Sequence, residues 1–103
     1  MIRMNEPQEV LGLCYDALKS NALSMKEANV LSACMGDFIK LAVVQTDYFV
    51  TRGQRLPIPK IPTLRTLLKC LQNSEYSIAA QKAHEIRAAM KPIINAAKEQ
   101  LKT

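Results

Sequence analysis

The sequence predicts an all-α protein, a small helical bundle of about four helices with a long, largely buried second helix and a proline-rich extended connection. Trp is absent, aromatic residues are scarce, and the apolar residues are mainly Ala, Leu, Ile, Val and Met, which is typical of helical bundles. Apolar residues also recur every three or four positions over long stretches. A chain of 103 residues has the size of one domain, so residues 1–103 are expected to form a single core.

The first helix is predicted over residues 6–20. Asn5 and Gln8 have the spacing of an N-cap and its reciprocal partner, and Pro7 is tolerated in a first turn. Apolar residues then follow at helical spacing, at Val10, Leu11, Cys14, Ala17 and Leu18.

The second helix is predicted to be long. Ser24 and Glu27 form a capping box, and no breaker follows until Gly53, after Arg52. Polar residues of this helix gather on a narrow stripe of Asn29, Ser32, Gly36, Lys40 and Asp47. Because most of the remaining circumference is apolar, the helix is expected to be either the centre of the domain or a subunit interface. Gly36 indicates a close helix crossing, a bend, or simply a tolerated surface glycine.

Residues 54–62 are predicted to be extended. Three closely spaced prolines forbid a helix here because proline lacks a backbone N–H and restricts the residue before it; they are Pro57, Pro59 and Pro62. Tyr48 and Phe49 are expected to anchor this segment from the second helix. Its own apolar contacts are predicted to come from Leu56, Ile58 and Ile61.

Two further helical patterns follow. Thr63 can cap a helix over residues 64–71, whose buried face is expected to be Leu64, Leu67, Leu68 and Leu71. A heptad-like apolar stripe then runs from Glu75 to Leu101 and is interrupted at Pro92. The proline either kinks one helix or separates two; since Lys91 is a poor N-cap, the kinked single helix is favoured.

The sequence carries no recognisable catalytic arrangement, and the protein is predicted not to be an enzyme. The only histidine is His84, which is expected on the surface, and no serine elbow, metal motif or paired carboxylates accompany it. Cys14, Cys34 and Cys70 lie in apolar patterns, which favours buried thiols over a disulfide framework or a zinc site. No metal and no cofactor are expected. Neither a signal peptide nor a membrane span is recognisable, so a cytoplasmic location without membrane contact is predicted.

Positive charge is concentrated in one segment. No acid lies between Asp47 and Glu75, and five basic residues fall there, Arg52, Arg55, Lys60, Arg65 and Lys69. The remaining nine Lys and Arg are balanced by nine Asp and Glu, so this basic segment accounts for the net charge of +5. Such a segment can contact an acidic protein or nucleic-acid phosphates, or it can be a solvated rim around an apolar loop.

The second helix and its exit resemble a known group of proteins over residues 26–64. The shared features are Lys26-Glu27-Ala28-Asn29, then Gly36, Lys40, Gln45, Tyr48, Gly53 and the stretch from Pro57 to Leu64. They resemble small helical proteins of unknown function that temperate phages and prophages of enteric bacteria encode. The resemblance implies an accessory protein that acts by binding in the bacterial cytoplasm, and it carries over no functional residue.

The resulting hypothesis is a non-enzymatic protein that binds an acidic protein partner through Arg52, Arg55, Lys60, Arg65 and Lys69. It is expected to form a homodimer through the second or the last helix. The alternative is a DNA-binding regulator that uses the same residues, although the segment lacks the interleaved aromatics that stack on bases.

Overall fold

The structure, a computed structural model, describes residues 5–57 and 63–102 and shows four helices. They are α1 (Asn5–Lys19), α2 (Met25–Arg52), α3 (Thr63–Gln72) and α4 (Tyr76–Leu101). No strand occurs in the described ranges. The predicted all-α class and the number of helices are confirmed.

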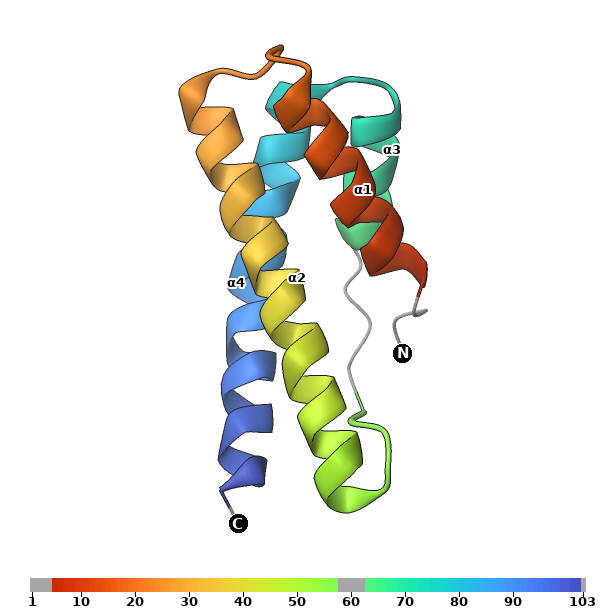
Figure 1. Cartoon of the computed structure of the whole chain (residues 1–103). Coiled ribbons are helices and arrows are strands. Elements are labelled where there is room, and N and C mark those ends of the chain that lie inside the picture. The colour runs from red at the N-terminus through yellow and green to blue at the C-terminus, as the bar shows by residue number, and fades with distance from the viewer. Residues whose placement is uncertain (1–4, 58–62, 103) are drawn as a thin grey trace.

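The helices form an elongated bundle in which α1 and α3 run one way and α2 and α4 run the other (Figure 1). Neighbours around the bundle are α1 with α2, α2 with α4, α4 with α3, and α3 with α1. The molecule measures 44 × 22 × 20 Å, because α2 and α4 continue beyond the ends of α1 and α3. One half is therefore a four-helix bundle, and the other half is built mainly on the parallel pair of α2 and α4.

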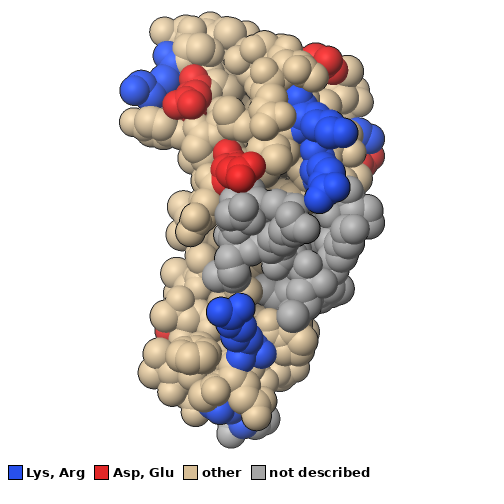
Figure 2. Space-filling view, turned by 90° about the vertical axis from the view of Figure 1, so that its right-hand side faces the viewer, with Lys and Arg blue, Asp and Glu red and all other residues tan. Residues whose placement is uncertain are grey.

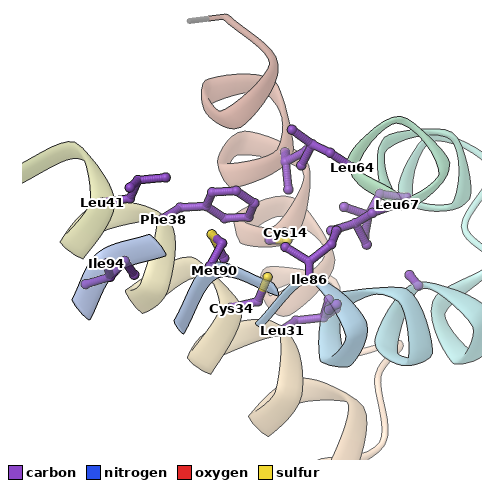
Figure 3. Packing of buried hydrophobic residues seen from close by; sticks show 14 of the residues in the cluster. Cys14, Leu31, Cys34, Phe38, Leu41, Leu64, Leu67, Ile86, Met90 and Ile94 are labelled. Atoms are coloured by element: carbon purple, nitrogen blue, oxygen red, sulfur yellow. The ribbon is translucent and has the colours of Figure 1, made fainter. Parts of the chain in front are cut away.

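A continuous apolar core joins all four helices (Figure 3). Each helix contributes at least one side chain of zero exposure, such as Val10, Leu31, Leu67 and Ile86. Short side chains on α4, at Ala79 and Ala83, are fully buried as well and let the neighbouring helices approach closely. The core ties the short helix α3 to the long pair of α2 and α4.

Most helix ends follow the sequence rules. Ser24 Oγ accepts from the Glu27 backbone N–H at 3.1 Å, and Glu27 Oε1 accepts from the Ser24 N–H at 2.9 Å, which confirms the predicted capping box. Gly53 ends α2 in the left-handed region at φ 70°, where a side chain is disfavoured. The start of α1 at Asn5 rather than residue 6, and its end at Lys19, are differences of one residue.

Replacing Ser24 with Ala is expected to lower the free energy of unfolding by about 1 kcal/mol, because the Glu27 backbone N–H loses its hydroxyl acceptor. Urea denaturation measures the change. Ser32, an exposed serine inside the same helix, supplies the matched control, and its replacement by Ala should be neutral or slightly stabilising. Equal losses of unfolding free energy for the Ser24 and Ser32 variants would contradict the stabilising role of the cap.

Helix α2 is buried on one face only. Its buried residues are Leu31, Cys34, Phe38, Leu41 and Val44, and they face α1 and α4. The opposite face remains exposed, although the sequence predicted a largely buried helix. A Cβ at Gly36 would meet nothing within 4 Å, so the chain itself makes no close crossing there.

Helix α4 is a single helix that contains Pro92, so two separate helices are excluded. Residues 53–57 leave α2 without regular structure, and Leu56 is buried, as predicted for an apolar anchor. Phe49 is 55% exposed, and its predicted contact with this segment stays a prediction, because residues 58–62 lie outside the described residues. The other predicted residues of the connection, Ile58, Pro59, Lys60, Ile61 and Pro62, lie outside the described residues.

Candidate functional site

A groove between α2 and α4 collects basic side chains from both helices. Its volume is about 390 Å³. Lys40 comes from α2, and His84, Arg87, Lys91 and Lys98 come from α4. Ile94, which is buried, adds an apolar surface to its lining. The positions on α4 are separated by three, four and seven residues, so they share one helix face.

One acidic side chain lies in this groove. Arg87 Nε donates to Asp37 Oδ2 at 2.8 Å, an ion pair that joins α4 to α2. Asp37 is only 16% exposed, whereas the Arg87 side chain is 42% exposed. The pair therefore fixes the two helices at the groove while it neutralises one of the groove's positive charges.

The other charged groups of the groove are not compensated within the described part of the chain. Lys40, Lys91 and Lys98 are exposed and make no ion pair with any described acid. Four Lys or Arg side chains and one Asp line the groove, which gives it a net charge of +3 when His84 is neutral. Like charges held together in a concave surface attract anionic groups. The groove is the strongest candidate binding site among the described residues.

The basic segment predicted from the sequence is divided in space. Arg52 ends α2, and its Nη2 donates to the backbone carbonyl of Gln100 at 2.6 Å, which ties the ends of α2 and α4 together. Arg55 is exposed close to it in sequence, whereas Arg65 and Lys69 are exposed on α3. Lys60 lies outside the described residues. Figure 2 accordingly shows Lys and Arg on both sides of the grey segment.

A second hollow adjoins the basic groove at His84 and has a volume of about 650 Å³. Its charged residues are Lys26, Glu27 and Glu85, which give it a net charge of −1 when His84 is neutral. His84 is exposed, as predicted, and its ring makes no hydrogen bond within the described residues. Nothing here orients the ring as a catalytic base requires. Across residues 5–57 and 63–102, no cluster of three His, Cys, Asp or Glu is arranged to hold a metal ion.

The three cysteines are buried and free, as the sequence predicted. Cys14 and Cys34 have zero exposure and come from α1 and α2 (Figure 3). Burial raises the pKa of Cys14 to about 11. Burial raises the pKa of Cys34 to about 12, with Cys14 and Asp37 adding to the rise and Arg87 opposing it. Both thiols are therefore protonated at neutral pH and form part of the apolar core.

Sequence reasoning missed the groove because its charges are dispersed along the chain. Lys91 and Lys98 are seven residues apart on the last helix, and this heptad spacing was a usable signal. Lys40 lies far away in sequence, and only the packing of α2 against α4 brings it to the same groove.

Comparisons with protein-family models, with curated proteins and with solved structures find no match to this chain. The resemblance to phage and prophage proteins therefore stays a prediction. No helix in the described ranges is both long and apolar enough to span a membrane.

Proposed function

We propose that this chain is a non-enzymatic binding protein that holds an acidic segment of a protein partner in the groove between α2 and α4. The observation that carries the proposal is the net charge of +3 in the groove, with Lys40, Lys91 and Lys98 lacking acidic partners among the described residues. An accessory protein of phage or prophage type that works by binding, as the resemblance implies, is consistent with this role.

The form of the groove favours a partner helix. Lys91 and Lys98 are seven residues apart on α4, or about 10 Å at 1.5 Å per residue. Carboxylates seven residues apart on a partner helix have the same spacing. The partner's apolar residues can contact Ala88, three residues before Lys91, and the small exposed part of Ile94 between the lysines. An acidic amphipathic helix therefore matches both the charge and the repeat of the groove.

Nucleic acid fits this groove less well. No Phe, Tyr or Trp side chain lines it for base stacking, and the Asp37 carboxylate adds a negative charge within it. A nucleic-acid surface would need basic groups in contact with several successive phosphates. An acidic protein segment therefore matches the groove better than DNA does.

Replacing Lys91 and Lys98 with Glu is expected to weaken binding of an acidic helical peptide by tenfold or more, roughly the loss of two charge pairs and their replacement by repulsion. The probe is a fluorescent Glu-rich peptide with carboxylates seven residues apart, and fluorescence anisotropy measures its binding. The matched control replaces Arg55 and Lys69 with Glu, which changes the net charge by the same amount outside the groove.

Three results would count against this proposal. Loss of peptide binding in the control variant alone would move the site to the basic segment. Tight binding of a short DNA duplex with a steep salt dependence, but not of the peptide, would indicate the DNA-binding alternative. Equal peptide affinity in the native protein and both variants would mean that neither surface binds acidic partners.

A further inference from the structure

The outer face of α2 exposes a row of large apolar side chains. Ile39 is 54% exposed, Val43 is 53% exposed and Val50 is 77% exposed. With Thr46 they follow spacings of four, three and four, which are the core positions of a heptad repeat. We call Ile39, Val43, Thr46 and Val50 the outer stripe. It faces away from the residues of α2 that contact α1 and α4, so the described helices do not cover it.

We propose that the outer stripe binds a second copy of this chain, with the two α2 helices antiparallel about a two-fold axis. In this register Ile39 lies opposite Val50 of the partner subunit, and Val43 lies opposite Thr46 of the partner subunit. The two-fold axis generates each of these pairs twice, so all four residues of each outer stripe contact the partner subunit. The proposal specifies the homodimer and does not depend on the acidic partner.

Charges beside the outer stripe favour the antiparallel pairing with a second copy of this chain. Lys40 and Asp47 are seven residues apart and lie on the same flank of the stripe. Both are exposed, and neither makes an ion pair within the described residues. In an antiparallel pair, equivalent flanks of the two helices face each other with reversed direction. Lys40 then faces Asp47 of the partner subunit, and the symmetry makes this pair twice. In the dimer, Lys91 and Lys98 are then the lysines of the groove that remain for an acidic partner.

The opposite flank is complementary as well. It contains Ala42 and Phe49, which are also seven residues apart. In the same register Phe49 lies beside Ala42 of the partner subunit, so a large ring meets a small side chain. This contact accounts for Phe49, a large apolar side chain that is 55% exposed.

A parallel pair of α2 helices does not offer the same match. In a parallel pair each flank faces the other flank of the partner helix. Lys40 and Asp47 would then lie beside the apolar flank with Ala42 and Phe49, and the charges would be unpaired. The charge pattern thus selects the antiparallel arrangement.

The dimer also places both basic grooves on one face. Lys40 lies on the flank that faces the groove between α2 and α4, since it lines that groove. The equivalent flanks of the two subunits meet on the same side of the dimer, and their grooves therefore open on that side. An acidic partner with two binding segments could then contact both grooves at once.

Charge reversal tests the register. The variants K40D and D47K each place like charges at both symmetric contacts, and each is expected to weaken the dimer about tenfold or more. The two variants mixed together are expected to form a heterodimer, because the flank of one becomes entirely acidic and that of the other entirely basic. Sedimentation equilibrium over a wide concentration range measures the association of the native chain, each variant and the mixture.

Two controls separate the interface from the fold. Lys69→Asp makes the same charge change on α3, far from the outer stripe, and should leave association unchanged. Circular dichroism should show native helix content for every variant, since all substituted residues are exposed. A native chain that stays monomeric at every concentration would overturn the proposal. So would association that the charge reversals leave unchanged, or variants that fail to associate when mixed.

Discussion

Leu67→Ala is expected to lower the free energy of unfolding by about 2–5 kcal/mol, the range for a buried leucine that leaves a cavity. Leu67 has zero exposure and lies on α3, between α1 and α4. With ten residues, α3 is shorter than the length at which an isolated helix is stable in water. Its structure therefore depends on packing, and a small domain has only about 5–15 kcal/mol of stability in total.

Leu68 is the matched control, because it is the same residue type in the next position of the same helix but only partly buried. Leu68→Ala removes the same atoms and should lower the free energy of unfolding clearly less than Leu67→Ala does. Urea denaturation measures both variants, and hydrogen exchange should show the largest loss of protection in α3 for Leu67→Ala. Similar losses of unfolding free energy for the two variants would contradict the burial of Leu67.

Raising the pH from 8 to about 10.5 is expected to lower the free energy of unfolding by roughly 3–5 kcal/mol through Cys14 and Cys34. Their folded pKa values of about 11 and about 12 lie above the value near 8.5 of an unfolded thiol. The folded state therefore binds more protons than the unfolded state in this range. The stabilisation is complete below the unfolded pKa and is lost as the pH rises toward the folded values.

The variant with both Cys14 and Cys34 replaced by Ala isolates this effect. Urea denaturation at a series of pH values should show a smaller alkaline loss of stability than in the native chain, although Ala also costs some packing at neutral pH. Lysine and tyrosine titration affects both proteins and cancels in the difference. An equal alkaline loss in the two proteins would show that the two thiols are not buried as described.

The binding surfaces of this protein depend on which basic residues lie close together in the folded chain. The basic segment is contiguous in sequence, yet Arg52 and Arg55 lie at the end of α2 while Arg65 and Lys69 lie on α3. These residues are close in sequence but not in space, because α2 ends at one end of the molecule and α3 lies in its other half (Figure 1). The groove, in contrast, is assembled from residues that are distant in sequence and close in the bundle.

The sequence by itself determined the local structure. Ser24 with Glu27 and the left-handed Gly53 define the ends of α2 because caps depend on neighbouring residues alone. The apolar periodicity likewise identified the helices and the burial of the three cysteines. The tertiary structure decided which face of α2 the chain covers and which lysines share a groove. These depend on the order of the helices around the bundle, and an apolar helix pattern does not specify which neighbour covers each face.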